Sequence, residues 1–128
     1  MDVKSAFLHG DLHEEICMEQ PHVFILMDSS LVCRLKKSLY GLKQAPRAWY
    51  AKMDSFLLDT RYSRCHSDNT VYTKKVGKSL IILVLYVDDL ILIGSDPNLI
   101  NHVKSNLKKQ FEMTDLGHLH YFLGLQVF

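Results

Sequence analysis

Two aliphatic runs separated by a pair of aspartates constrain the fold of this chain more than any other feature. The runs are residues 80–87 and 90–93, and Asp88 and Asp89 lie between them. Both runs are rich in strand-forming residues without alternation, so we expect strands that are buried on both faces or nearly so. The short connection predicts a hairpin with both carboxylates at or near its tip. No glycine eases this turn, although aspartate tolerates left-handed backbone geometry better than most residues.

The adjacent aspartates permit two interpretations. An isolated Asp-Asp pair is usually a solvated turn. Here the flanking strands look central, and adjacent anions at the mouth of a buried hairpin repel each other unless a divalent cation binds. A pair of magnesium ions about 3.5–4 Å apart promotes phosphoryl transfer, provided that another strand supplies a further carboxylate. Asp2 is available for this role, but composition alone does not single it out from the other acids.

Helical periodicity marks two further elements. Pro46 and Pro97 suit the first turn of a helix, and apolar residues recur at helical spacing after each of them. We therefore predict helices over residues 46–59 and 97–110, the second with Asp96 as its N-cap. Shorter strands are expected over residues 15–20, 31–35, 70–73 as an edge-type strand, and 121–128 as a final strand. Strands mixed with two helices, several of them joined by hairpins, indicate an α+β fold.

Composition limits the class of protein. The chain has 128 residues, of which 48% are hydrophobic and 23% charged, as in a single globular domain with a real core. Its three cysteines are odd in number and far apart, which argues against a disulfide framework and favours a reducing compartment. No signal-peptide pattern or membrane-spanning run is present. We therefore expect a soluble intracellular protein that is neither secreted nor membrane-bound.

The formal net charge of +1 hides a polarity. Residues 1–28 hold six acids and one base, whereas residues 34–64 hold eight bases and two acids. The basic segment suits contact with a nucleic-acid backbone, although the total charge forces no such conclusion. Trp49 shares a helical face with Met53 and Phe56, so we prefer a core position for it over base stacking. The seven histidines form no four-ligand zinc signature.

Six blocks of sequence follow one another in a fixed order: residues 2–10, 15–21, 35–50, the Tyr-Val-Asp-Asp of 86–89, 115–117 and 122–124. This ordered series resembles the reverse transcriptase of copia-type (pseudovirus) long-terminal-repeat retrotransposons. A lone Tyr-x-Asp-Asp is a weak signal, whereas the ordered set is a strong one. The chain departs from the family where His22 and Val23 replace a usual glycine, and where Thr114 replaces a frequent lysine.

The resemblance implies a polymerase palm-like antiparallel sheet with a central catalytic hairpin, packed on two main helices. Residues 1–128 would form a single partial reverse transcriptase domain, with the fingers, thumb and RNase H absent. The implied activity is that of an RNA-directed DNA polymerase, which adds deoxynucleotides to a primer 3′-hydroxyl by two-metal phosphoryl transfer and serves retrotransposition. We expect the fragment alone to be inactive.

Cofactors, partners and location follow from the same resemblance. Two magnesium ions would be the cofactors, with manganese as a substitute. The partners would be an RNA template, a DNA primer strand, deoxynucleoside triphosphates and the remaining domains of the polyprotein. The location would be cytoplasmic, in a virus-like particle, with the nucleus as a further compartment.

The family's roles carry over to matching positions. Asp2 and Asp88 would hold the metal ions and Asp89 would support them, so these three are the implied catalytic and metal-binding residues. The implied nucleotide-binding residues are Phe7, Tyr40, Gly41 and Lys43. The implied template- and primer-binding residues are Gln44, Pro46, Arg47, Tyr86, Val87, Leu123 and Gly124.

Several of these positions have plainer interpretations. Phe7 would select deoxynucleotides by a clash with a 2′-hydroxyl, but most phenylalanines simply pack in a core. Gly41 suits a close approach of backbone to ligand. Lys43 and Arg47 would face phosphate or, equally well, solvent. Gly124, in the implied primer grip, would otherwise be a bulge glycine in an ordinary strand.

Two other functions remain open. If the chain is expressed without the rest of the enzyme, it would be an inactive truncated or host-retained remnant of the same fold. Such a remnant would bind nucleic acid at most. Alternatively, a small metal-dependent nuclease or nucleotidyltransferase would use the same acids. That last protein would hydrolyse its substrate without a primer.

Overall fold

The computed structural model describes residues 1–24 and 30–127. The chain divides into two compact units, which are described separately. The sheet unit comprises Met1–Ala6 with Met53–Phe128, and the ribbon unit comprises Phe7–Lys52. The expectation of a single partial domain stays a prediction.

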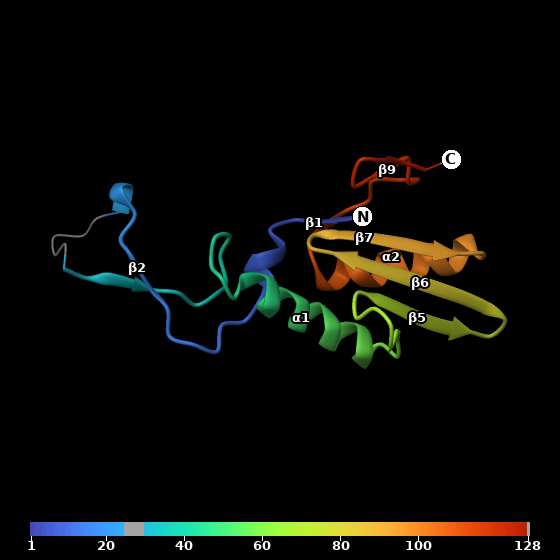
Figure 1. Cartoon of the computed structure of the whole chain (residues 1–128), viewed down its shortest axis with the longest axis horizontal. Helices are drawn as coiled ribbons and strands as arrows, with labels where there is room; N and C mark the ends of the chain where they lie inside the picture. The colour runs from blue at the N-terminus through green and yellow to red at the C-terminus, as the bar shows by residue number, and fades with distance from the viewer. Residues whose placement is uncertain (25–29, 128) are drawn as a thin grey trace. The chain divides into compact units, whose positions relative to one another are not determined.

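A six-stranded antiparallel sheet dominates the sheet unit, in the order β4-β5-β6-β7-β1-β8. Its strands are β1 (Asp2–Val3), β4 (Ser63–Arg64), β5 (Val71–Val76), β6 (Ser79–Tyr86), β7 (Asp89–Gly94) and β8 (Met113–Thr114). Figure 1 shows β5, β6 and β7 side by side, with β1 next to β7. The predicted hairpin is confirmed as β6 and β7. The edge position predicted for residues 70–73 is wrong, because β4 returns after the first helix and covers that side of β5.

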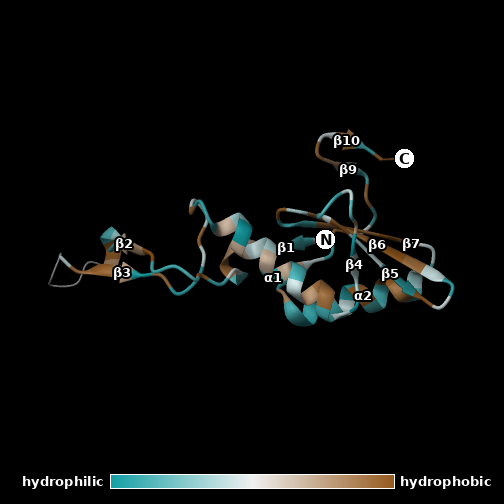
Figure 2. Cartoon of the chain, turned by 60° about the horizontal axis from the view of Figure 1, so that its bottom comes forward, coloured by the Kyte–Doolittle hydropathy of each residue, from teal (hydrophilic) through white to brown (hydrophobic). Residues whose placement is uncertain are grey.

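The two predicted helices are confirmed as α1 (Ala45–Asp59) and α2 (Pro97–Gln110). Asp96 caps α2, where its carboxylate accepts hydrogen bonds from the backbone N–H groups of Asn98 and Leu99. Figure 2 shows helices of mixed polarity beside a hydrophobic central hairpin. Each helix therefore has an apolar stripe available for packing. The predicted α+β class, with an antiparallel sheet and two helices, is confirmed.

The core of the sheet unit lies on one face of the sheet. In β6 the side chains of Ile81, Leu83 and Leu85 are at most 3% exposed, whereas Leu80 is 47% exposed. The prediction that both faces of this strand are buried is therefore wrong. In the described residues the helices cover only one face of the sheet. The side chains of β6 are therefore alternately buried and more exposed, although nearly all of them are hydrophobic.

A hydrogen-bonded carboxylate ties the end of α1 to the sheet. Asp54 accepts hydrogen bonds from the guanidinium of Arg64 and from the hydroxyl of Tyr72, the latter at 2.7 Å. Partial burial acts to raise the pKa of Asp54, but the hydrogen bonds from Arg64 and Tyr72 outweigh it and lower the pKa. The ionised form is therefore favoured by folding.

The ribbon unit contains a two-stranded ribbon, β2 (Cys17–Glu19) with β3 (Val32–Arg34), and the start of α1. The 3-10 helix η1 (Ala6–His9) leads into the unit, and a second, η2 (His22–Phe24), follows β2. Trp49 on α1 is 2% exposed, which confirms its predicted core position. Both strands predicted over residues 15–20 and 31–35 are confirmed in shortened form.

The final segment is a second hairpin rather than one strand. It consists of β9 (Tyr121–Phe122) and β10 (Leu125–Gln126), joined by Leu123 and Gly124. Both joining residues have positive φ, 50° and 79° respectively, which is the geometry of a tight two-residue turn. The predicted strand over 121–128 is therefore wrong in its middle, and residue 128 lies outside the described part. The three cysteines are free. Within residues 1–24 and 30–127, no helix has the length and hydrophobicity needed to cross a membrane.

We expect Asp11, in the ribbon unit, to titrate with a pKa of about 2, because the ammonium groups of Lys37 and Lys52 donate hydrogen bonds to it. Its pKa in the folded chain lies below the unfolded value, so its stabilisation is present above the ordinary aspartate range and is lost as the pH falls towards 2. Solvent exposure limits this stabilisation to about 1 kcal/mol or less. Carbon-13 NMR of the carboxyl group measures the pKa. Lys37→Met should raise it and Lys36→Met should leave it unchanged; equal values in all three chains would contradict the assignment.

Candidate active site

The tip of the β6–β7 hairpin is a two-residue turn formed by Val87 and Asp88. Tyr86 and Asp89 pair across it as the last residues of the two strands. Aspartate tolerates left-handed geometry better than most residues, but in this turn it is Val87 that adopts it, with φ of 53°. A β-branched residue rarely adopts this geometry, and holding it costs roughly 1–3 kcal/mol. The surrounding ladder therefore maintains a strained tip.

Strand β1 brings Asp2 to this tip. Asp2 pairs in register with Asp89, and the backbone N–H of Val3 donates to the carbonyl of Asp88 at 2.8 Å. On the other side of Asp2, Met1 and Leu90 exchange hydrogen bonds between their backbone groups, each 2.8 Å long. Backbone bonds on both sides of Asp2 thus place the three predicted aspartates together.

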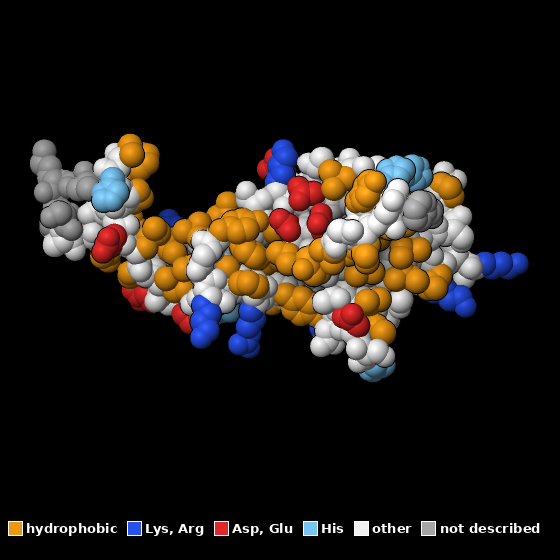
Figure 3. Space-filling view, turned by 45° about the horizontal axis from the view of Figure 1, so that its top comes forward, with side chains coloured by type: hydrophobic (Ala, Val, Ile, Leu, Met, Phe, Trp, Pro, Cys, Tyr) orange, Lys and Arg blue, Asp and Glu red, His pale blue; other side chains and the backbone are white. Residues whose placement is uncertain are grey.

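The sheet register aligns a row of polar residues on the open face. Opposed residues in an antiparallel sheet point to the same side, whereas consecutive residues point to opposite sides. The row is Tyr86, Asp89, Asp2 and Thr114. Leu90, which follows Asp89, is 1% exposed and lies in the core, so the row faces away from it. Figure 3 shows acidic side chains gathered on one face of the molecule, with hydrophobic side chains around them.

Electrostatic repulsion is concentrated at Asp89. Partial burial raises the pKa of its carboxyl, and the negative charges of Asp88 and Asp2 raise it further. The N-terminal ammonium of Met1 opposes this rise, while burial lowers the pKa of that ammonium itself. A divalent cation beside the three carboxylates would remove the repulsion.

The carboxylates do not form a ready-made metal cage. Among the described residues, no group of three or more His, Cys, Asp and Glu side chains is arranged to hold a metal ion. Magnesium is usually held by only one or two carboxylates, and substrate phosphates and water complete its coordination. The oxygen donors and the repulsion at Asp89 fit such an open site, and Asp2 with Asp88 would supply the carboxylates.

Three further predicted residues of the sheet unit are Tyr86, which belongs to this row, and Leu123 and Gly124, which form the turn of the β9–β10 hairpin. Tyr86 is 48% exposed and its ring meets that of Phe122 edge-on, with centroids 5.9 Å apart. The ring contact connects the tip to the β9–β10 hairpin, whose turn holds the predicted Leu123 and Gly124. Gly124 is thus a turn residue with positive φ and not the bulge glycine of an ordinary strand.

The ribbon unit holds the other predicted residues. Phe7 is 9% exposed and its ring lies 4.4 Å, centroid to centroid, from that of the exposed Tyr40. Gly41 has φ of 92°, and a Cβ there would meet nothing within 4 Å. Its backbone conformation, rather than a crowded neighbour in this chain, therefore explains the glycine. The remaining predicted positions are the half-buried Gln44 and the exposed Lys43, Pro46 and Arg47. Their roles stay predictions.

Sequence reasoning missed two residues of the site. Thr114 lies opposite Asp2 on β8, and Phe122 supports Tyr86. Strand β8 has only two residues, so no periodic pattern marks Thr114. The sequence showed Thr114 only as a departure from the family pattern, and its place next to Asp2 follows from the sheet register alone.

We expect Val87→Gly to raise the free energy of unfolding by up to about 1 kcal/mol, because glycine adopts positive φ without strain. Loss of strain outweighs the greater backbone freedom that glycine gives the unfolded chain. Val71→Gly is the matched control. Val71 lies in an extended strand, so its replacement by glycine is expected to destabilise the chain. Urea unfolding measures both variants; equal losses of stability in the two would contradict a strained Val87.

Comparison with known proteins identifies the family. The family described as Reverse transcriptase (RNA-dependent DNA polymerase) matches residues 1–128, and the chain belongs to it. A retrovirus-related Pol polyprotein from transposon TNT 1-94 of Nicotiana tabacum is 51% identical over 99% of this chain and 10% of the polyprotein. That from transposon RE1 of Arabidopsis thaliana is 42% identical over 98% of the chain and 9% of the polyprotein. The predicted resemblance to copia-type reverse transcriptases is confirmed.

A shorter relative also matches. A putative transposon Ty5-1 protein from Saccharomyces cerevisiae is 34% identical over 99% of this chain and 42% of that protein. The chain thus spans less than half the length of this relative, and about a tenth of the two plant polyproteins. No solved structure matches the chain.

Proposed function

We propose that this chain carries the catalytic centre of an RNA-directed DNA polymerase palm, which extends a DNA primer on an RNA template during retrotransposition. The observation that supports it most is the β1–β7 register, which places Asp2 opposite Asp89 and beside Asp88. Three carboxylates from two separate segments of chain thereby meet on the open face of one sheet. Family membership supplies the reaction class, and the register supplies the reason why these acids act together.

Asp2 and Asp88 hold two magnesium ions in this proposal, and Asp89 supports them. When bound, the ions make the primer 3′-hydroxyl a better nucleophile and offset negative charge on the leaving pyrophosphate. The 3′-hydroxyl loses its proton to solvent, and its oxygen forms a bond to the α-phosphorus of the nucleotide as the bond to pyrophosphate breaks. Asp89 adds negative charge beside the other two carboxylates, and its pKa is raised by partial burial first and then by the charges of Asp88 and Asp2.

The remaining residues position the substrates. Phe7, Tyr40, Gly41 and Lys43 bind the incoming deoxynucleotide, and Phe7 excludes the 2′-hydroxyl of a ribonucleotide. The template and primer contact Gln44, Pro46, Arg47, Tyr86, Val87, Leu123 and Gly124. Lys43 and Arg47 are exposed, so their charged groups can contact phosphate. Tight positioning of the primer and the nucleotide lowers the free-energy barrier of phosphoryl transfer.

A primer-extension assay tests the proposal. This chain and the complete polymerase are each given magnesium, a primed RNA template and deoxynucleotides. We expect extension by the complete polymerase only, because this chain spans about a tenth of the length of the plant polyproteins that it matches. Absence of extension by the complete polymerase would favour the inactive remnant, whereas cleavage of nucleic acid without a primer would favour a nuclease. Either result would overturn the proposal.

A further inference from the structure

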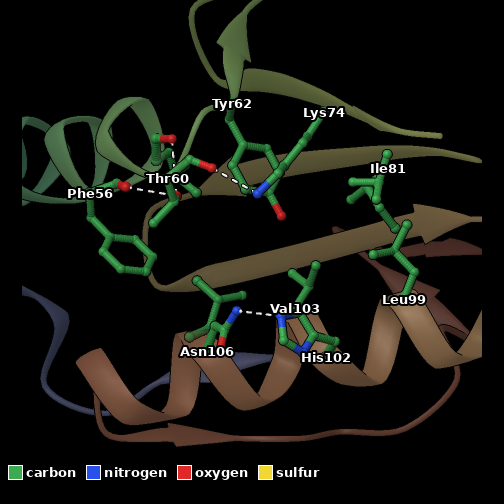
Figure 4. Close-up of a pocket in the computed structure, with 12 residues that line it drawn as sticks. Phe56, Thr60, Tyr62, Lys74, Ile81, Leu99, His102, Val103 and Asn106 are labelled. Atoms are coloured by element: carbon green, nitrogen blue, oxygen red, sulfur yellow. Dashed lines mark hydrogen bonds between the residues drawn. The ribbon is translucent and has the colours of Figure 1, made fainter.

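A cavity in the sheet unit lies on the helix-covered side of the sheet, away from the row of aspartates. Its volume is about 230 Å³, and α1, β5, β6 and α2 all contribute to its lining. Figure 4 shows Lys74 and Tyr62 entering it from the sheet side, with His102, Val103 and Asn106 rising from α2. Lys74 pairs with Ile81 in the sheet, and consecutive residues alternate between faces. The cavity is therefore separated from the acidic row by the sheet itself.

The floor of the cavity is apolar. Leu57 and Ile81 are 0% exposed, Leu107 is 1% exposed and Val103 is 8% exposed. The ring of Phe56 forms part of the wall and is held by an edge-on contact with Phe111, with centroids 5.3 Å apart. An apolar cavity of about 150 Å³ suffices to hold a benzene ring, so this one has room for a ring and a short polar group.

The polar groups of the cavity favour a negative charge. Among the described residues, those that line the cavity include Lys74 and His102 but no aspartate or glutamate. The ammonium of Lys74 donates to the carbonyl of Thr60 at 2.8 Å and lies 5.1 Å from the ring centroid of Tyr62. An ammonium has three N–H donors, so donors remain after the bond to Thr60. Burial raises the pKa of the Tyr62 hydroxyl, which keeps it as a neutral donor.

We propose that this cavity binds small aromatic carboxylates, with the ring on the apolar floor and the carboxylate at Lys74 and Tyr62. This class of ligand matches the cavity because its carboxylate complements the positive charge at one end and its ring complements the apolar surface at the other. A pocket of this kind buries most of a ligand of about ten non-hydrogen atoms. Affinity for so small a ligand is modest, in the millimolar range or somewhat below.

The test uses benzoate as the probe and the whole chain, isotope-labelled for NMR, with no divalent cation present. Saturable shifts are expected at amides of the cavity, including those of Val103 and Leu107. Benzyl alcohol, which has the ring but no charge, should bind about tenfold more weakly, the usual difference for a hydrogen bond to a charged group. Equal affinity for the two probes, or no saturable shift with benzoate, would overturn the proposal.

Variants of two neighbouring lysines locate the charge. Lys74→Met should weaken benzoate binding by about tenfold and leave benzyl alcohol binding within about twofold. Lys75→Met is the matched control, because Lys75 pairs with Leu80 on the other face of the sheet, and it should change neither affinity. A loss of benzoate affinity that is equal in the two variants would show nonspecific attraction and refute a site at Lys74.

Filling the cavity tests the location independently. Val103→Phe and Leu99→Phe each place a ring in the space, and each should abolish saturable benzoate shifts. Two positions are used because either substitution alone risks overpacking, and NMR of each unliganded variant verifies its fold. Full benzoate affinity in a folded variant would place the ligand elsewhere and overturn the proposal.

Discussion

Replacing Asp88 with asparagine in the complete polymerase should abolish primer extension, with a rate loss of at least about 10²–10³-fold. Asp88 lies at the hairpin tip, and its backbone carbonyl accepts a hydrogen bond from Val3 at 2.8 Å. Asparagine has almost the same shape, so the turn and this backbone bond persist while the negative charge that we propose to bind metal is lost. Single-turnover incorporation of a deoxynucleotide on a primed RNA template measures the effect.

The stability of the same variant separates lost chemistry from lost folding. Partial burial and then repulsion by Asp88 raise the pKa of Asp89, so ionisation of Asp89 opposes folding above the ordinary aspartate pKa. Asp88→Asn removes part of that repulsion, and the free energy of unfolding at neutral pH should not fall. Asp59→Asn makes the same charge change at an exposed residue at the end of α1 and should leave extension intact. Near-normal extension by Asp88→Asn would refute the assigned role.

Gly10→Ala should produce the largest loss of stability among the single-methyl changes in the ribbon unit, about 1–3 kcal/mol. A Cβ at Gly10 would lie 2.9 Å from the Cβ of Ala48 and 2.9 Å from the backbone nitrogen of Trp49. Real Cβ atoms do not approach so closely, and the backbone of α1 cannot rotate away as a flexible side chain does. The 3-10 helix and α1 must therefore separate, which loosens the packing of Trp49.

Trp49 reports directly on this change, because it is the sole tryptophan of the chain and touches the altered site. Urea unfolding of the whole chain, followed by the fluorescence of Trp49 and by circular dichroism, measures the free energy of unfolding. Gly94→Ala is the matched control, since the nearest atom there is the terminal methyl of Ile81, which can move aside. Gly94→Ala should therefore lower the free energy of unfolding by less than Gly10→Ala does. A Gly10→Ala chain within about 0.5 kcal/mol of the original would contradict the close contact.

Local patterns predicted the elements of the fold well. The helices were found because apolar residues recur at helical spacing after Pro46 and Pro97, and because Asp96 is a good N-cap. The hairpin was found because only two residues interrupt the aliphatic runs. The final strand was predicted wrongly, because the left-handed turn at Leu123 and Gly124 falls inside an apolar run and only the glycine signals it.

The residues of the candidate site likewise fall into those that the sequence indicated and those that it did not. The pattern of aliphatic runs pointed to Asp88 and Asp89, whereas Asp2 was singled out by the family resemblance alone. Thr114 stood out only as a departure from the family pattern, and Phe122 only as part of the block 122–124, so neither was marked as a residue of the site. Pairing between distant segments brings these groups together, and no local periodicity reports such a pairing.

The sequence alone determined the short-range features, because neighbours along the chain decide them. These are the two amphipathic helices, the carboxylates in the hairpin connection and the family motifs. The tertiary structure decided which acids meet and which face of the sheet stays open. The Met1 ammonium bonds to Leu90, 89 positions away, and this pairing carries Asp2 to the hairpin tip. Helix packing against one side of the sheet then leaves the aspartates on the other, because opposed strand residues share a face.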